Sequence, residues 1–229
     1  MNHETPSWQR FYELSDLLEA YASADFTFAD TAEVAGPGLA SYLRIAAREP
    51  SRASKAIEQI DDLLSVGLFS EEIAEDVETM PHIRPPLGSS VEDCLRIARR
   101  HLVRLLQDPS QIPPAHPQTS WEWHERFPRL GQLLGAYFNQ EFSSFYTTRD
   151  EALNEYIDES WPEDSLMAAQ EIGELLTMVT SDRELARAAS ALGLALLPPD
   201  GMTLRQWLQT VREKILGHGR PVAVAKEGS

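Results

Sequence analysis

The chain has 229 residues, of which 42% are hydrophobic, so it can form one large domain or two of ordinary size around a buried core. It carries 36 acidic against 20 basic residues, and the formal charge of −16 argues against direct nucleic-acid binding, because phosphate contacts need a cationic surface. The single cysteine, Cys94, excludes an internal disulfide and a multi-thiolate metal site. The acidity itself has two interpretations, solubility or a surface for a basic partner.

The start of the chain and its apolar runs bear on its compartment. Residues 1–8, MNHETPSW, have neither the basic start nor the apolar segment of a secretion signal. No uninterrupted apolar run approaches the roughly 20 residues that cross a bilayer. We therefore expect a soluble, cytoplasmic protein that does not act at a membrane.

Apolar residues recur at helical spacing through the first half and predict five helices. The first unit begins around Trp8, its first helix runs to about Tyr21, and a turn or mobile loop with the sequence Gly-Pro-Gly follows at 36–38. Pro50 stops the second helix, and Gly67 ends the third. A short acidic helix over 71–78 precedes Pro81, and Ser89 or Ser90 opens the fifth helix. The fifth has the apolar face Val91, Cys94, Leu95, Ala98, Leu102 and Leu105.

The second half repeats the first. Phe127–Phe142, FPRLGQLLGAYFNQEF, reads as a helix and matches Phe11–Phe26, FYELSDLLEAYASADF, at an offset of 116. IGELL at 172–176 matches IDDLL at 60–64 at an offset of 112. The last helix matches the fifth at an offset of 113, which places Trp207 opposite Cys94. Thr148 and Glu151 form a capping box, Pro162 ends that helix, and a further helix is expected over Leu185–Leu196.

These patterns predict an all-α protein of two similar helical bundles that arose by internal duplication. A proline-rich run separates the two bundles. The expected divisions are a degenerate first unit at 1–110, a linker at 111–119, a second unit at 120–217 and a disordered tail at 218–229.

No pattern of an enzyme or a metal site is present. The six histidines are scattered, and the pair His116 and His124, eight residues apart across a loop, is a weak signal. The acids around Asp150 lack the glycine-pivoted spacing of a calcium loop. Glycine-elbow, phosphate-loop and dinucleotide patterns are absent, and Cys94 lies on a predicted buried face. We therefore expect a protein that is not an enzyme and uses no cofactor.

A basic cluster on the fifth helix runs against the acidic average. Its residues are Arg96, Arg99, Arg100, His101 and Arg104. Salt bridges to the acids of 71–78 are the favoured interpretation, because the second half of the chain has no equally dense cluster at the matching place. A ligand site is the alternative.

The stretch from Phe127 to Ile157 resembles the family of contact-dependent growth inhibition (CdiI-like) immunity proteins. The resemblance rests on a leucine-rich helix that leads into Tyr-Phe-x-Gln-acid-aromatic, followed by DEALNEYI. Where that family more usually has aspartate and tryptophan, this chain has Glu141 and Phe142. The first copy has Ala22 and Ala24 in place of the motif's phenylalanine and glutamine. The matching residues are Leu130, Leu133, Leu134, Tyr137, Phe138, Gln140, Glu141, Phe142, Asp150, Ala152 and Leu153.

The resemblance implies a cytoplasmic inhibitor that binds a cognate toxin, typically a nuclease domain, and blocks its active site or substrate surface. A basic toxin suits an acidic inhibitor. The rival interpretation is a non-enzymatic helical adaptor or scaffold that binds a host protein. The leucines and aromatic residues of the motif (Leu130, Leu133, Leu134, Tyr137, Phe138 and Phe142) are expected in the core, with surface contacts as the alternative for the aromatic ones. The expected toxin-facing residues are Gln140, Glu141, Glu151, Glu155, Asp158, Glu159, Glu163 and Asp164.

Overall fold

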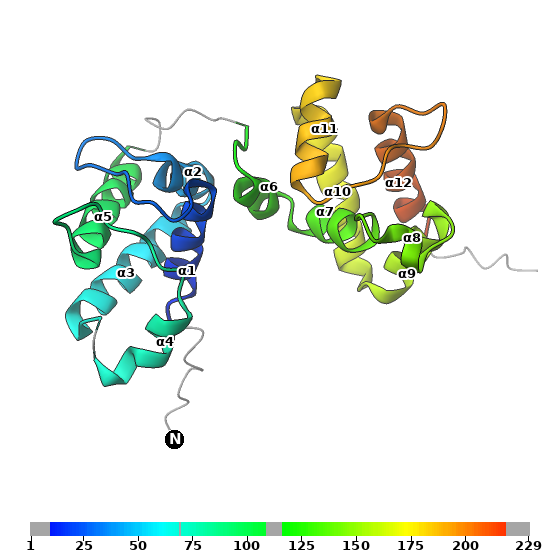
Figure 1. Cartoon of the computed structure of the whole chain (residues 1–229). Helices are drawn as coiled ribbons and strands as arrows, with labels where there is room; N and C mark the ends of the chain where they lie inside the picture. Colours follow the sequence, from blue (N-terminus) through cyan, green and yellow to red (C-terminus); the bar gives the residue numbers. More distant parts are fainter. Residues whose placement is uncertain (1–9, 69, 109–115, 219–229) are drawn as a thin grey trace, which may run out of the picture. The chain divides into compact units, whose positions relative to one another are not determined.

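The structure, a computed structural model, describes residues 10–68, 70–108 and 116–218. Regular structure in these ranges is helical, and the one pairing of extended backbone there is an isolated bridge between Thr27 and Arg84 (Figure 1). The all-α prediction is therefore confirmed. The chain divides into two compact units, residues 1–122 and 123–229, and the division falls within helix α6 (Ser120–Arg126).

The first unit is a bundle around a core of buried aliphatic and aromatic residues such as Leu14, Tyr42 and Ile60. Ser90 and Asp93 cap its last helix with the reciprocal hydrogen bonds of a capping box. The elements are α1 (Tyr12–Glu19), the 3-10 turn η2 (Ala20–Ala24), α2 (Pro37–Ala46), α3 (Pro50–Val66), the 3-10 turn η3 (Glu71–Ile73), α4 (Ala74–Thr79) and α5 (Val91–Gln107).

The second unit has a core of its own, and its elements follow a similar order with one short helix, α8, that has no counterpart in the first unit. The backbone N–H of Glu151 donates to the Thr148 hydroxyl, so the predicted N-cap is present. Much of the expected linker, at 111–115, and the expected tail beyond 218 lie outside the described residues. The elements are α7 (Pro128–Gln132), the π turn η5 (Leu133–Tyr137), α8 (Phe142–Phe145), α9 (Arg149–Glu159), α10 (Pro162–Met178), α11 (Asp182–Ala191) and α12 (Leu204–His218).

Prolines begin helices in this protein. Pro37, Pro50, Pro128 and Pro162 each occupy the first helical position, where the missing N–H would have had no intrahelical partner. The Gly-Pro-Gly sequence at 36–38, expected to be a loop, is therefore the start of α2.

The helix expected from Phe127 to Phe142 is wrong in its second half. The α-helical pattern ends at Gln132, a π turn follows, and Phe138 leaves the helix with φ −124°. Gly193, at φ +96°, lies against this turn so closely that an added Cβ would be 2.6 Å from the Gly135 Cα. The helix expected over Leu185–Leu196 likewise ends at Ala191, two residues before this close approach.

Contacts between the first and third helices recur in the two units at matching positions. Arg10 forms an ion pair with Asp62, and Arg126 forms one with Glu174. Each arginine also lies over the ring of the phenylalanine that follows it, at 5.2 and 5.5 Å. The two arginines are 116 residues apart in the sequence, and their acidic partners are 112 residues apart.

A backbone contact obeys the same offsets. The N–H of Leu14 donates to Gln59 Oε1 at 2.8 Å, and the N–H of Leu130 donates to Glu171 Oε2 at 2.7 Å. In both units a side chain of the long third helix thus satisfies a donor of the first helical turn, which has no intrahelical acceptor.

One matching ion pair has its charges exchanged. Glu13 on α1 pairs with Arg52 on α3 at 2.7 Å, whereas Arg129 on α7 pairs with Asp164 on α10 at 2.8 Å. The offsets are again 116 and 112. The position of the contact is kept while the sign at each end is reversed.

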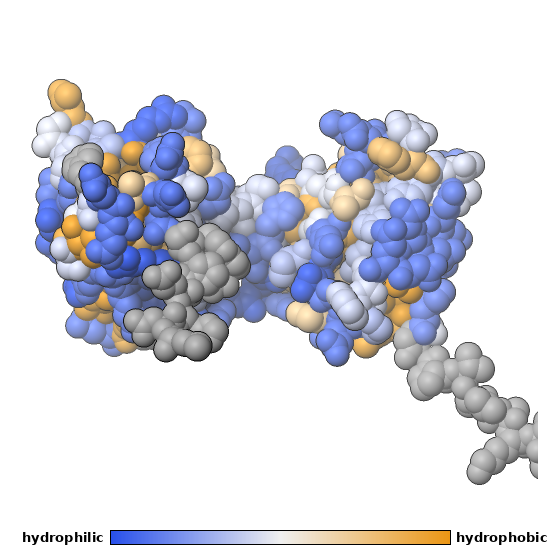
Figure 2. Space-filling model, turned by 90° about the horizontal axis from the view of Figure 1, so that it is seen from below, coloured by the Kyte–Doolittle hydropathy of each residue, from blue (hydrophilic) through white to orange (hydrophobic). Residues whose placement is uncertain are grey.

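The surface is largely hydrophilic. On the face of the second unit seen in Figure 2, on the right, hydrophilic residues cover most of the area and apolar residues show in small separate patches. Within the described ranges, no helix combines the length and the apolar composition needed to cross a membrane.

Candidate functional site

The motif residues at 130–142 form part of the core of the second unit. Leu130, Leu133, Leu134 and Phe138 are fully buried. The Phe138 ring meets Trp207 edge to face at 5.2 Å. The other two motif aromatics, Tyr137 and Phe142, are half-buried at the edge of this core. They therefore combine a packing role with an accessible edge.

Two tyrosines of this edge hold acids of α9. The Tyr137 hydroxyl donates to Glu159 Oε2 at 3.1 Å, and the Tyr146 hydroxyl donates to Glu155 Oε1 at 2.9 Å. The two rings stack with centroids 6.3 Å apart. Burial, together with the neighbouring carboxylate, raises the pKa of each tyrosine to about 12, so each hydroxyl remains a donor at neutral pH. The aromatic edge thus orients two of the acids predicted from the sequence.

The remaining predicted site residues divide into two groups. Glu151 accepts from the N–H of Thr147, and Asp164 pairs with Arg129, so both take part in local structure. The other four are largely exposed, and in the described parts of the chain none of their side chains has a recorded hydrogen bond or ion pair: Gln140, Glu141, Asp158 and Glu163. Asp158 and Glu163 thus carry charge available to a partner.

Two exposed aromatic residues lie beside these acids. Trp161 is 78% exposed and follows Glu159 by two residues, at the start of α10. Phe145 is 70% exposed, and its ring lies 6.4 Å from that of Tyr146. Large exposed aromatic side chains next to charged groups are typical of protein interfaces. The sequence analysis missed both, although an aromatic residue beside proline or serine in a polar turn was a usable signal.

Signs of catalytic or metal chemistry were sought in the same ranges. No group of three or more histidine, cysteine or carboxylate side chains suited to a metal ion occurs within 10–68, 70–108 and 116–218. Cys94 is buried, and burial raises the pKa of its thiol to about 11, which disfavours the reactive thiolate.

The basic cluster of α5 is structural, but its expected partners were wrong. Arg99 binds Asp61 of α3 through two hydrogen bonds of 2.6 and 2.8 Å, and Arg96 pairs with Asp93 of its own helix. Arg104 donates to the Ala32 carbonyl. In the 71–78 segment, Glu72 pairs with Arg10, ahead of α1, and not with α5.

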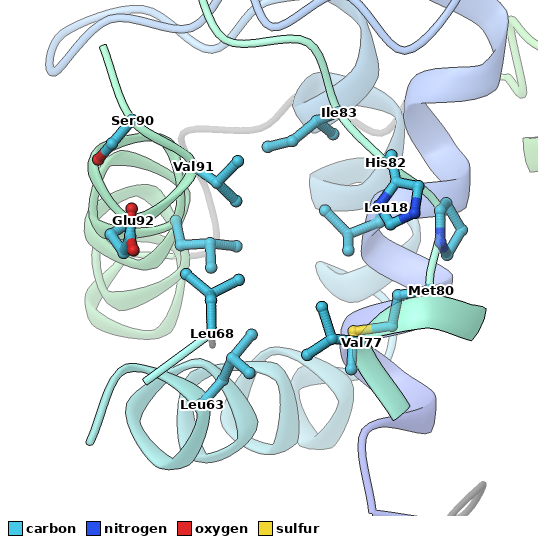
Figure 3. Close-up of a pocket in the computed structure, with 12 residues that line it drawn as sticks. Leu18, Leu63, Leu68, Val77, Met80, His82, Ile83, Ser90, Val91 and Glu92 are labelled. Atoms are coloured by element: carbon cyan, nitrogen blue, oxygen red, sulfur yellow. The ribbon is translucent and has the colours of Figure 1, made fainter. Parts of the chain in front are cut away.

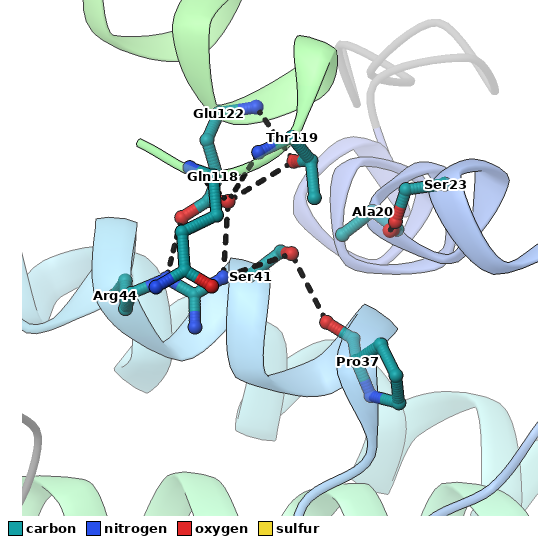
Figure 4. A network of polar contacts seen from close by, with 8 residues as sticks. All are labelled: Ala20, Ser23, Pro37, Ser41, Arg44, Gln118, Thr119 and Glu122. Atoms are coloured by element: carbon teal, nitrogen blue, oxygen red, sulfur yellow. Dashed lines mark hydrogen bonds and ion pairs between the residues drawn. The ribbon is translucent and has the colours of Figure 1, made fainter. Parts of the chain in front are cut away.

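A second polar network anchors residues 118–122 within the first unit (Figure 4). Glu122, 1% exposed, accepts from Arg44 Nε at 2.6 Å and Nη2 at 3.0 Å. The N–H groups of Gln118 and Thr119 donate to the same carboxylate. Burial opposes the charge, but these donors and Arg44 outweigh it and hold the pKa of Glu122 below its usual range. Every polar atom of this carboxylate is engaged, which indicates a structural role.

Comparison with known proteins gives one finding. Residues 126–215 match the model of a family described as CdiI immunity protein. The matched stretch begins in α6 and ends in α12, so it includes the aromatic edge and the acids of α9. No match was found among curated proteins or among solved structures. The matched stretch contains the residues on which the sequence resemblance rests.

Proposed function

We propose that this protein is an immunity protein, whose second unit neutralises a cognate bacterial toxin by binding it. The observation that carries the proposal is the family match over residues 126–215. The protein inhibits by occupying a surface of the toxin and does no chemistry of its own.

The toxin-facing surface is the acidic side of α9 and the turn that leads into α10. Asp158 and Glu163 supply accessible charge there, and Glu155 and Glu159 are held in place by tyrosine hydroxyls. Trp161 and Phe145 add apolar area beside the charge. Preordered side chains lose less conformational entropy on binding, and aromatic anchors commonly contribute most of the affinity.

The toxin that fits this surface is basic, and we propose a nuclease domain. An enzyme that binds a phosphate backbone presents lysine and arginine around its substrate channel. An inhibitor with a formal charge of −16 complements that field, which accelerates association and favours seating over the channel. Inhibition then follows from exclusion of the nucleic-acid substrate.

The first unit is, in our proposal, a diverged copy of the second. The similar order of helices and the contacts at offsets of 116 and 112 support the duplication. One of its three motif aromatics is lost: Tyr21 and Phe26 match Tyr137 and Phe142, but Ala22 stands where the second unit has the buried Phe138. The Tyr21 hydroxyl donates to the buried Asp30, so the tyrosine-held acid of the first unit does not lie on its surface.

Charge reversal tests the surface. The double variant Glu155→Lys/Asp158→Lys should slow association with the toxic domain encoded beside this gene by about tenfold or more at low salt, and by less at high salt. The matched control is Glu33→Lys/Glu58→Lys, which changes the net charge equally through exposed residues of the first unit. Stopped-flow binding measures the rates. Equal rates for the two double variants would contradict the proposed surface.

Coexpression tests the function itself. Cells that express the neighbouring toxic domain should grow when this protein is present, and the two proteins should copurify. Growth arrest despite normal expression, with no copurification, would contradict toxin neutralisation and favour the helical adaptor interpretation.

A further inference from the structure

The first unit contains an apolar cavity of about 490 Å³ that the proposed function does not use. It lies between α3 and α5 on one side and α1, α4 and the segment that follows α4 on the other (Figure 3). Binding sites for small molecules fall in this range of volume and are mostly apolar, with a few polar groups. The cavity is thus large enough for a small organic molecule.

The polarity of the lining changes from the floor of the cavity to its mouth. The buried lining residues are all apolar, and the polar ones are exposed or half-exposed. The hydroxyl of Ser90 is engaged with Asp93 in the cap of α5, which leaves His82 and Glu92 as the polar groups open to a ligand. A molecule that fits this gradient has an apolar body and one polar end. The buried floor consists of Leu18, Leu63, Met80, Ile83 and Leu95.

The charge at the mouth is negative. Glu92 is the one carboxylate in the described lining, and no lysine or arginine occurs there. In the described part of the first unit, the half-buried Glu92 side chain has no hydrogen bond and no ion pair. A cation at the mouth is therefore attracted, and an anion is repelled.

The matching position in the second unit carries the opposite charge. Arg205, at the offset of 113 from Glu92, donates to the carbonyl oxygens of Leu176 at 2.8 Å and Val179 at 2.6 Å. These carbonyls belong to the C-terminal end of α10, the third helix of that unit, where the helix dipole is negative. The second unit thus supplies a cation of its own at this place.

The first unit has an acid where the second has this arginine. Its third helix, α3, ends at Val66, and Leu63 and Leu68, on either side of that end, line the cavity. A carboxylate and the negative end of a helix dipole therefore border the same apolar space. Both favour a cation there.

We propose that this cavity binds a small amphiphile with a cationic head group. The apolar body, of roughly ten carbon atoms for a cavity of this size, fills the floor. The head group lies at the mouth, beside Glu92 and the end of α3, where the matching place in the second unit holds the Arg205 guanidinium. The site lies wholly in the first unit, outside the family match, and does not depend on toxin binding by the second.

Decylammonium serves as the probe, used below the concentration at which it forms micelles. The full-length protein should bind it saturably, one molecule per chain, in isothermal titration calorimetry at low salt. Decanoate has the same chain length and an anionic head, and should bind at least about tenfold more weakly because of Glu92 and the end of α3.

A charge reversal at the mouth tests the head-group site. Glu92→Arg copies the second unit and should weaken decylammonium binding about tenfold or more, because the new guanidinium repels the head group. The matched control is Glu33→Arg, which changes the net charge equally at an exposed position of the first unit. It should weaken binding by about twofold or less, since the charge lies away from the cavity and is screened.

A second pair of variants tests the apolar floor. Val91 faces the cavity at the start of α5 and is half-exposed, so the larger ring of Val91→Trp should enter the cavity (Figure 3). This change should weaken decylammonium binding about tenfold or more. Leu204→Trp is the control, because Leu204 is the matching half-exposed position in the second unit. It should leave the affinity unchanged, and circular dichroism with thermal melting should confirm that every variant folds.

Four outcomes would overturn the proposal. The first is that decylammonium does not bind saturably to the unchanged protein. The second is that decanoate binds as tightly as decylammonium. The third is that Glu92→Arg and Glu33→Arg weaken decylammonium binding equally, which would assign it to the net charge of −16. The fourth is that Val91→Trp and Leu204→Trp, both folded, bind decylammonium equally well. None of these results bears on toxin neutralisation, which is measured by growth rescue.

Discussion

The two units have an ion pair at the same position between their first and third helices, but with the charges exchanged. In the first, Glu13 is buried at 3% exposure and is held by Arg52 and the Tyr42 hydroxyl, each at 2.7 Å. In the second, Arg129 and Asp164 form the matching pair with side chains that are 37% and 26% exposed. Two units with matching contacts can thus keep an ion pair at one position while its charges are exchanged and its exposure to water changes.

The units also differ at the fourth helix. Just after α11, the Gly193 backbone lies against Gly135, whereas α4 of the first unit borders an apolar cavity of about 490 Å³. The family match covers the unit that has the glycine contact.

The buried pair gives the largest expected difference. Arg52→Ala leaves the buried Glu13 without its cation and should lower the free energy of unfolding of the first unit by about 3–5 kcal/mol. Arg129→Ala removes the matching, more exposed pair and should cost the second unit about 1 kcal/mol or less. Hydrogen exchange, read separately for peptides of each unit, measures both. Similar losses in the two units would break the comparison.

A charge swap controls for lost side-chain packing. Glu13→Arg/Arg52→Asp copies the charge arrangement of the second unit into the first. It should retain more stability than Arg52→Ala, because neither charge is left alone. A double variant as unstable as Arg52→Ala would mean that the other contacts of these residues, the Tyr42–Glu13 hydrogen bond and the Arg52–Asp16 ion pair, hold this part of the unit.

The close approach of Gly193 to Gly135 gives the next largest expected effect on stability. Gly193→Ala places a Cβ 2.6 Å from the Gly135 Cα at a φ of +96°, and should destabilise the second unit by about 2–5 kcal/mol through steric overlap and backbone strain. Gly201→Ala is the matched control, since its φ is +80° and nothing lies within 4 Å of the added Cβ. It should cost about 1–2 kcal/mol. Equal losses in thermal unfolding would show that the close approach carries no extra cost.

The smallest expected effect concerns the side chain that accepts the hydrogen bond of the Leu14 N–H in the first unit and of the Leu130 N–H in the second. Burial raises the pKa of Glu171, whereas the first unit has the neutral Gln59 at this place. Because the folded-state pKa is raised, the stability that Glu171 contributes is present at acid pH and lost as the pH rises through that value. Glu171→Gln should therefore stabilise the second unit at neutral pH by about 1 kcal/mol or less.

A pH series of denaturant unfolding measures this change. The gain from Glu171→Gln should be largest at neutral pH and should shrink as the pH falls below the folded-state pKa of Glu171. A variant that is less stable than the unchanged protein at pH 7 would mean that the carboxylate is a better acceptor for the Leu130 N–H than an amide is.

Local signals in the sequence predicted most of the helices. The caps at Ser90 and Thr148 and the stop at Gly67 lie where the patterns placed them, since capping depends on a few adjacent residues. The π turn after Gln132 was not predicted, and its contact with Gly193 joins segments far apart in the sequence, which local patterns do not reveal.

The candidate site was predictable in composition and not in geometry. The acids of α9 stand out by charge alone, but their hydrogen bonds to Tyr137 and Tyr146 require the fold to bring separate segments together. The same limit applies to Asp164, expected on the binding surface and paired with Arg129, and to Arg99, whose partner is Asp61. Pairing across helices follows tertiary distance, which helical periodicity does not encode.

The exchanged charges of the ion pair between the first and third helices also bear on how a chain with two similar units folds correctly. If the first helix of one unit docked on the third helix of the other, Glu13 would face Asp164, and Arg129 would face Arg52. Both crossed pairings bring like charges together, and one of them does so at a position that is buried in the first unit. Tandem copies are prone to such misassembly between their domains, and the inverted pair penalises it at each of the two wrong contacts.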